Sequence, residues 1–401
     1  MPGNGPPNRP GAIKLTLPAT VVALGVVSLL TDLSSEMIYP LLPVFLTTVL
    51  GAGPQALGLI EGAAESAASL LKVISGRWSD RARRRKPLVV AGYSLAGAMR
   101  PLIGLAAGWP TVLLLRFADR VGKGLRTSPR DALIADATPP AQRGEAFGFQ
   151  RSLDHACAVA GPLVAAALLT FAGLPLRAVF LLAAVPAVAV VAVLVGWVKE
   201  APRGALGPPA NIMGAWHQLG RPFHVVLAAL LLFTLGNSTD AFLLLRLSSS
   251  GVSAAGVALL WSAFHVVKMF SSYAFGRVSD RLGRRLMVIA GWSVYAAVYL
   301  TFAVVASRTA VIATLLVYGL YYGLTEPVER AWVADLVPPH LRGTAFGFYH
   351  GVVGLAALPA SLLFGLLWQR FGAPTAFATG AGFAFVATVV LALMPRGSPR
   401  P

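Results

Sequence analysis

Long apolar runs separated by short polar loops are the feature that most limits how this chain can fold. A helix needs about 20 mostly apolar residues to cross the hydrocarbon core of a bilayer. Only 12% of the 401 residues are charged, whereas soluble domains carry roughly 25%, so a soluble globular fold is excluded. We expect an all-α membrane protein with twelve transmembrane helices, in the ranges 17–47, 54–76, 87–107, 110–137, 146–170, 175–198, 223–247, 254–275, 287–306, 309–335, 345–368 and 374–394.

The net charge of +17 does not indicate a nucleic-acid partner, because the basic residues collect in short loops on one side of the predicted spans. The opposite loops hold only Arg177, Arg308 and Arg370. Basic loops stay in the cytoplasm, so we expect a multi-pass plasma (inner) membrane protein with both termini cytoplasmic. The basic loops contain Arg77, Arg81, Arg83, Arg84, Arg85, Lys86, Arg143, Lys199, Arg203, Arg221, Arg277, Arg281, Arg284, Arg285 and Arg342.

The chain contains an internal repeat. GRWSDR (76–81) returns 200 residues later as GRVSDR (276–281), and ADATPPAQRGEAFGF (135–149) returns as ADLVPPHLRGTAFGF (334–348). Matches in the same order at nearly constant offset indicate two related halves. The longest polar interruption lies midway between them. We therefore expect an N-terminal tail (1–16), a six-helix bundle (17–198), a linker (199–222), a second six-helix bundle (223–394) and a C-terminal tail (395–401).

Three motifs resemble those of the major facilitator superfamily of transporters. GRVSDRLGRR (276–285) and its first-half copy GRWSDRARRRK (76–86) are similar to the loop signature after the second span of each half. RFADRVGKG (116–124) resembles the fourth-span motif. Gly148, Cys157, Gly161-Pro162 and Ala165-Ala166 follow the spacing of the fifth-span motif, which is typical of proton-coupled drug exporters. The resemblance implies two pseudo-symmetric bundles around a central cavity, and it favours efflux by proton antiport.

Acidic residues inside predicted spans are candidates for proton coupling. Asp32 and Glu36 are one helical turn apart, and Glu61 and Glu65 repeat this spacing. Two carboxylates that share a face away from water repel each other when both are ionised, so proton binding is favoured. The alternative is a set of fixed salt bridges with Lys72, Arg100, Arg116 or Arg120. Asp154 and His155 form a further candidate cluster. Asp131 and Glu329 lie near the cytoplasmic ends of their spans, where we expect water to reach them.

Charged residues of the fourth span are candidates for solute binding. Arg116, Asp119, Arg120 and Lys123 follow one another at helical spacings, and the cations could hold an anionic or zwitterionic solute. Alternatively, Asp119 neutralises Arg116 or Arg120 in a structural network. The second half contributes sparser candidates, namely Asp240, Lys268 and Glu326.

The repeated loop motif predicts a conformational latch between the halves. Asp80 and Asp280 each begin a basic loop, and an aspartate there can stabilise the N-terminus of a neighbouring helix. We expect the nearby arginines to pair with acids across the interface of the halves. The predicted latch comprises Gly76, Asp80, Arg81, Arg84, Gly276, Asp280, Arg281 and Arg284. Gly148, Gly161 and Pro162 form the predicted helix-packing motif, because small residues let helices approach closely.

The sequence favours a monomeric secondary transporter of a small molecule over other membrane proteins. It contains no G-x-x-x-x-G-K loop for phosphate binding, and it has no spacing of nucleophile and base or of metal ligands, so we expect no enzyme, cofactor or metal. Proton-coupled efflux is the leading hypothesis. Proton- or sodium-coupled uptake of an anionic or zwitterionic metabolite is the alternative within this class. A lipid flippase or a membrane sensor on the same scaffold is the alternative outside it.

Overall fold

The computed structural model describes residues 17–52, 54–203, 212–252 and 254–394, and their secondary structure is helical without strands. Eight of the helical segments are long and apolar enough to cross a membrane by length and composition. The apolar residues that face outward on them include Leu163, Val188 and Leu362, which are more than half exposed. Such surface is stable only in lipid. The all-helical fold that the sequence predicts is confirmed.

The first half of the chain forms long helices with short connecting turns. Its elements are α1 (Ala19–Glu36), η1 (Tyr39–Leu41), α2 (Leu42–Val44), η2 (Phe45–Val49), α3 (Pro54–Arg81), α4 (Lys86–Leu102), η3 (Ile103–Leu105), α5 (Trp109–Ala137), η4 (Pro140–Gln142), α6 (Arg143–Thr170), α7 (Leu176–Leu182) and α8 (Ala184–Gly196).

The second half repeats this order after a short connecting helix. Its elements are α9 (Ile212–Gln218), α10 (Gly220–Gly236), α11 (Ala241–Ser249), α12 (Ala254–Leu282), α13 (Arg284–Val304), α14 (Arg308–Leu336), η5 (Pro339–Leu341), α15 (Arg342–Phe371) and α16 (Ala373–Leu393).

Helix occupies each of the twelve predicted ranges, but three of them are interrupted, the range 175–198 only at Ala183 between α7 and α8. The helix predicted over 17–47 ends at Glu36 and continues as short turns around Pro40, whose ring cannot donate to the helix ladder. The helix predicted over 223–247 is broken at residues 237–240. Tyrosine hydroxyls satisfy polar groups at this break: Tyr295 donates to the carbonyl of Gly236 at 2.9 Å.

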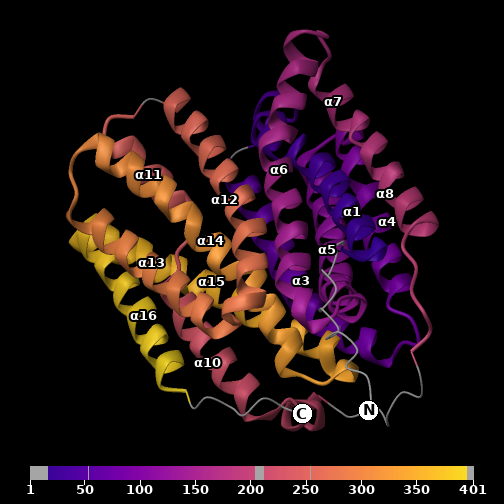
Figure 1. The fold of residues 1–401 in the computed structure, drawn as a ribbon. Coiled ribbons are helices and arrows are strands. Elements are labelled where there is room, and N and C mark those ends of the chain that lie inside the picture. The colour runs from indigo at the N-terminus through magenta and orange to yellow at the C-terminus, as the bar shows by residue number, and fades with distance from the viewer. Residues whose placement is uncertain (1–16, 53, 204–211, 253, 395–401) are drawn as a thin grey trace, which may run out of the picture.

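The two halves meet along two helix pairs, α6 with α12 and α3 with α15. Figure 1 shows α6 and α12 close together at the lower side and diverging toward the upper side. Glycines make the lower crossings possible. A Cβ atom on Gly276 would lie 2.4 Å from the carbonyl oxygen of Gly144, and one on Gly76 would lie 2.1 Å from that of Gly343. We call the lower side the basic face; it carries residues 81–86 and 281–285.

The interiors of the two halves differ in chemistry. The second half has an aromatic core, in which Phe233 stacks on Trp292 with 4.7 Å between ring centroids and Tyr295 stacks on Tyr299 at 4.0 Å. The first half instead buries charge: Asp119 is fully buried among arginines of α4 and α5. Related backbones thus carry more aromatic rings in the core of the second half and more buried charge in the first.

Candidate functional site

The repeated aspartates hold the halves together at the basic face. The carboxylate of Asp80 accepts hydrogen bonds from the backbone amides of Gly343 (2.9 Å) and Thr344 (2.6 Å), in the first turn of α15. Asp280 accepts the equivalent bonds from Gly144 and Glu145 in the first turn of α6. A carboxylate at a helix N-terminus satisfies otherwise unpaired amides and favours the helix dipole. Each contact joins one half to the other.

These aspartates lie in helices rather than in loops, which corrects the sequence prediction. α3 continues to Arg81 and α12 to Leu282, so Asp80 and Asp280 belong to the last helical turns. The helical geometry aims each carboxylate at the helix across the interface. A loop would not fix this direction.

The ion pairs of the latch include arginines that the sequence pattern did not assign to it. Arg85 binds Asp80 at 2.8 Å and Asp136 at 3.0 Å within the first half. Its counterpart Arg284, which was assigned, binds Asp280 at 2.5 Å and Asp335 at 3.1 Å within the second half. Two further pairs cross the interface. They are Arg143 with Asp335 (2.5 Å) and Arg342 with Asp136 (2.6 Å).

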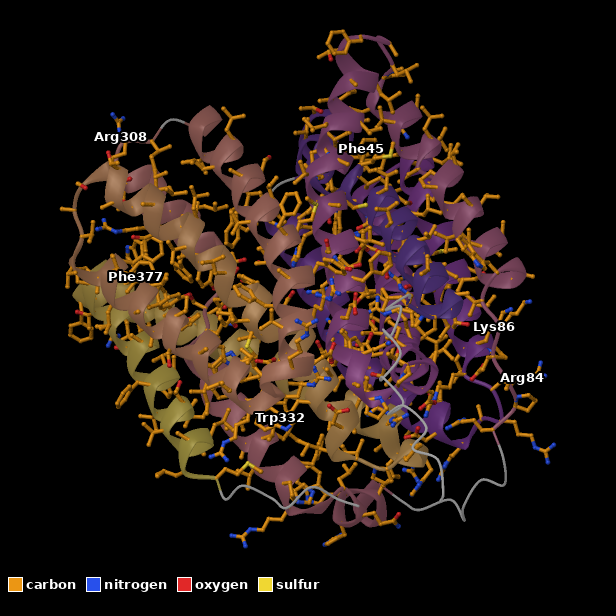
Figure 2. The ribbon with its side chains drawn as sticks, viewed as in Figure 1. Phe45, Arg84, Lys86, Arg308, Trp332 and Phe377 are labelled. Atoms are coloured by element: carbon orange, nitrogen blue, oxygen red, sulfur yellow. The ribbon has the colours of Figure 1, made fainter. Side chains whose placement is uncertain are left out.

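Three of the arginines in the predicted latch are exposed at the basic face. They are Arg81, Arg84 and Arg281, and Figure 2 shows Arg84 pointing away from the helices at the edge of the molecule. We define the basic-face latch by the eight residues that make the contacts above: Asp80, Arg85, Asp136, Arg143, Asp280, Arg284, Asp335 and Arg342.

A central cavity of about 360 Å³ lies mostly within the first half. This volume falls in the range of pockets that hold small molecules, roughly 300–1,000 Å³. Only two of its described lining residues, Arg330 and His350, belong to the second half. The lining residues are Asp32, Ser35, Glu36, Tyr39, Lys72, Arg100, Arg120, Lys123, Arg126, Thr127, Arg130, Arg151, Asp154, Arg330 and His350.

The structure brings three of the predicted proton-coupling acids to this cavity. Asp32 and Glu36 line it from α1, and Asp154 lines it from α6. Gly161 allows α6 to approach α1, because a Cβ atom there would lie 2.4 Å from the Cβ of Glu36. Asp154 accepts a hydrogen bond from Arg151 at 2.8 Å. The side chains of residues 61–66, and so of Glu61 and Glu65, lie outside the described part of the structure.

The candidates on α5 fall into two groups. Arg120 and Lys123 line the cavity. Asp119 lies behind it, 3.0 Å from Arg116 and 2.9 Å from Arg100. Arg100 also donates to the carbonyl of Thr31 at 2.7 Å, which ties α4 to α1. Arg116 and Asp119 therefore belong to the structural network that the sequence left open as the alternative.

The candidates of the second half lie beside the cavity rather than on its wall. Glu326 forms a two-pronged ion pair with Arg151, at 2.6 and 2.9 Å, and its carboxylate lies 3.4 Å from the ring nitrogen of His155. Asp240 accepts hydrogen bonds from the hydroxyl of Tyr322 at 2.8 and 3.0 Å. Lys268 lies over the ring of Tyr322, 3.5 Å from its centroid.

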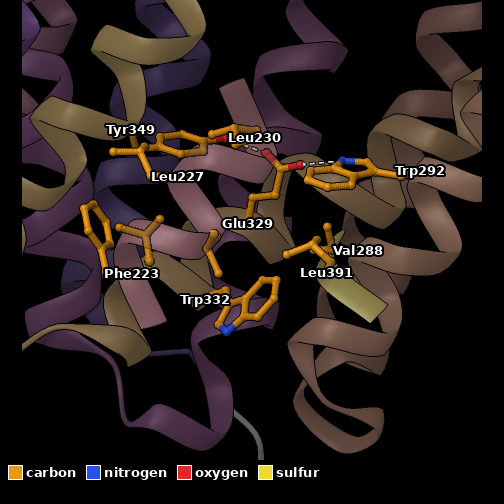
Figure 3. Close-up of a pocket in the computed structure, with 11 residues that line it drawn as sticks. Phe223, Leu227, Leu230, Val288, Trp292, Glu329, Trp332, Tyr349 and Leu391 are labelled. Carbon is orange, nitrogen blue, oxygen red and sulfur yellow. Dashed lines mark hydrogen bonds between the residues drawn. The ribbon is translucent and has the colours of Figure 1, made fainter. Parts of the chain in front are cut away.

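Asp131 and Glu329 are less open to water than the sequence suggested. Asp131 is fully buried between Arg130 (2.9 Å) and His350 (2.7 Å). Glu329 projects into an apolar pocket, where Trp292 and the hydroxyl of Tyr349 donate to its two oxygens at 3.2 and 3.0 Å (Figure 3). The pocket holds only about 10 Å³, close to the smallest space that accepts one water molecule.

Comparison with known proteins identifies the chain. The family model described as Major Facilitator Superfamily matches residues 24–249 and again residues 226–401. The chain belongs to the major facilitator superfamily. It is a multi-pass integral membrane transporter, and the proteins that it resembles are transporters rather than enzymes.

Members of the superfamily resemble all or part of the chain. An uncharacterized MFS-type transporter of Methanocaldococcus jannaschii is 32% identical over 381 residues, which are 94% of each chain. The quinolone resistance protein NorA of Staphylococcus aureus is 24% identical over 154 residues, 38% of this chain and 40% of NorA. The structure of the human organic anion transporter MFSD10 has a TM-score of 0.76 at 17% identity, covering 93% of this chain and 99% of that one.

Several residues that line the central cavity were not predicted from the sequence. Arg126 and Arg130 continue the spacing of Arg120 and Lys123 along α5, so the same helical pattern could have found them. Arg330 carried no comparable signal, since it reaches the cavity only through the packing of the second half on the first.

Proposed function

We propose that this member of the superfamily is a secondary transporter of small solutes that carry two or more negative charges. The charge of the central cavity carries this proposal: of its fifteen described lining residues, eight are Lys or Arg and three are Asp or Glu. Excess charge inside a membrane protein is costly and marks solute or ion pathways. Arg and Lys are also the side chains that recognise carboxylate and phosphate groups.

Arg126 is the clearest solute contact in the cavity. It is buried, and its guanidinium lies over the ring of Tyr93, 4.2 Å from the centroid. Its Nη1 atom donates no hydrogen bond to any residue that the structure describes. A buried donor without an acceptor costs about 1–3 kcal/mol. An anionic oxygen bound in the cavity would remove this cost.

The two halves serve as the moving bodies of an alternating-access cycle. In this proposal all twelve helical segments cross the membrane, the halves 17–198 and 223–394 are joined by the linker 199–222, and both tails are cytoplasmic. The basic face is then the cytoplasmic side, and the basic-face latch closes that side in this structure. Support comes from the repeated latch contacts, which can break together when the halves rock.

Proton influx drives solute export in this proposal. Asp32, Glu36 and Asp154 line the cavity beside the cations and are placed to exchange protons as an anion comes and goes. The similarity to a quinolone resistance protein over 154 residues favours export. A membrane potential that is negative inside also assists the exit of anions, by about 2.3 kcal/mol per charge per 100 mV. The human neighbour, an organic anion transporter, is consistent with this cargo.

A thermal-shift assay on the purified protein tests the binding step. A ligand that binds the folded state raises the melting temperature. At constant ionic strength, we expect phosphate, sulfate or citrate to stabilise the protein, and glucose or choline to have no effect. Arg126→Gln should weaken the stabilisation by at least about tenfold in apparent affinity, the size of one charged hydrogen bond.

Arg281→Gln is the matched control, because Arg281 is exposed at the basic face and should bind anions as the parent protein does. Stabilisation by the neutral or cationic solutes alone would contradict the proposed function.

A further inference from the structure

One ion pair links the two halves at the level of the cavity. Arg151 lies on α6 of the first half and lines the cavity, and Glu326 lies on α14 of the second half. Two parallel hydrogen bonds, at 2.6 and 2.9 Å, join the guanidinium to the carboxylate. This paired geometry is the strongest that Arg and a carboxylate form. It contributes to holding the halves in the arrangement seen here.

A buried ammonium group lies close to this pair without an acceptor of its own. Lys268 on α12 is only 6% exposed. Its Nζ atom contacts the ring faces of Tyr322 and Phe264, at 3.5 and 5.0 Å from the centroids, and donates no hydrogen bond within the described residues. Ring faces attract a cation, but they do not replace the three acceptors that an ammonium group can use.

Two carboxylates of the second half, Asp240 and Glu326, lie near enough to attract Lys268 electrostatically. Asp240 is held in place by the hydroxyls of Tyr322 and Tyr318, at 2.8 and 3.5 Å. Glu326 has no hydrogen-bond donor from its own half within the described residues; its contacts are Arg151 and His155, both on α6. Glu326 is therefore the carboxylate whose partners would leave if the halves separated, and Lys268 is the cation beside it that would remain.

We propose that a solute anion replaces Glu326 as the partner of Arg151, and that Glu326 then forms an ion pair with Lys268. The exchange turns a bond between the halves into a bond within the second half, so occupancy of the cavity releases one constraint on rocking. The exchange leaves both cations beside an anion: the solute lies against Arg151, which also keeps Asp154, and Glu326 lies against Lys268. A buried carboxylate of Glu326 or a buried ammonium of Lys268 without an opposite charge beside it would be strongly unfavourable. This inference rests on the proposed function, because a solute anion starts the exchange.

In this exchange Lys268 and Glu326 act as positioning residues and do not contact the solute. Their absence from the described wall of the cavity agrees with that role. A neutral solute would not displace Glu326 from Arg151. The exchange therefore allows the halves to rock only when the bound solute is an anion.

Spin-label distances test the exchange in the full-length protein. In a Cys157→Ser background, one pair of labels at positions 84 and 282 reports on the basic face, and another at 172 and 309 reports on the opposite face. All four positions are exposed. Inorganic phosphate is the probe, and its binding is followed separately by thermal shift. In the parent protein, we expect phosphate to raise the fraction of molecules in which the labels at positions 84 and 282 are far apart, that is, in which the basic face is open.

Lys268→Met should keep phosphate binding but abolish this rise, whereas Lys268→Arg should retain it. Glu326→Gln should raise the long-distance population without phosphate, by roughly tenfold, within the range of ordinary conformational coupling. The double variant should behave as Glu326→Gln, since no carboxylate remains to exchange.

Two results would overturn the exchange: phosphate opening the Lys268→Met variant as it opens the parent, or Glu326→Gln keeping the closed basic-face distance. Failure of phosphate to bind the parent would count against the proposed function instead. The Glu326→Gln measurement needs no ligand and still decides whether the Arg151 bridge restrains the halves.

Discussion

Single carboxylates at the basic face each hold a helix of the opposite half by its N-terminus. Asp80 accepts two backbone hydrogen bonds from α15 and one from Arg85. Asp80→Asn keeps one acceptor oxygen but loses the charge and the second acceptor. Hydrogen bonds to charged groups contribute about 1.5–3 kcal/mol. We expect the basic face to open at least about tenfold more often, measured as the alkylation rate of a cysteine at position 344 in the Cys157→Ser background.

Asp280→Asn should have the same effect, because Asp280 makes the equivalent contacts with α6. Arg84→Gln is the control that should leave the rate unchanged, since Arg84 is exposed. An alkylation rate in Asp80→Asn equal to that of the parent would show that this aspartate is not part of a latch.

For single residues, the sequence predicts which aspartates lie at the interface of the halves better than it predicts their arginine partners. The repeated GRxSDR strings place Asp80 and Asp280 at the interface, and both do meet a neighbouring helix N-terminus. The arginine partners depend on which side of the last helical turn faces inward. That direction follows from the packing of α3 and α12, so Arg85 could not be chosen over Arg84 from spacing alone.

Glycines at the points where helices of the two halves cross determine how closely the halves approach. A Cβ atom on Gly276 would lie 2.4 Å from the carbonyl oxygen of Gly144 and 2.9 Å from the Cα of Gly148. Gly276→Ala must therefore push α12 away from α6. Overpacking of this kind costs about 1–3 kcal/mol, and we expect a lower melting temperature than that of the parent protein.

Gly382→Ala is the matched control, because a Cβ atom there would have no neighbour within 4 Å among the described residues and α16 lies away from the crossing. If Gly276→Ala melts at the temperature of the parent, the close crossing does not limit the closed state.

The long helices follow from the apolar runs, but their breaks follow from tertiary contacts. Pro40 signals the end of the first helix in the sequence. Residues 237–240 carry no proline, and the break there is supported by tyrosines of α13 and α14, which bind the carbonyl oxygen of Gly236 and the carboxylate of Asp240. Those partners lie far along the chain, so local periodicity predicts one continuous helix.

On the scale of the whole molecule, a symmetric frame carries an asymmetric interior. Both halves contribute equivalent latch contacts, yet thirteen of the fifteen described residues that line the cavity belong to the first half. The sequence indicates this imbalance through the excess of intramembrane charge in the first half. It does not indicate that the cations outnumber the acids on one surface, because that surface exists only after α1, α5 and α6 pack together.

Solute export from proteoliposomes tests the central claim most directly. Vesicles that contain the protein are loaded with a mixture of anionic, neutral and cationic metabolites, an inward proton gradient is imposed, and the released solutes are identified by mass spectrometry. We predict that solutes with two or more negative charges leave, that internal acidification accompanies their exit, and that Arg126→Gln vesicles retain them. Release of neutral or cationic solutes instead, or no release above that of the Arg126→Gln vesicles, would contradict the account.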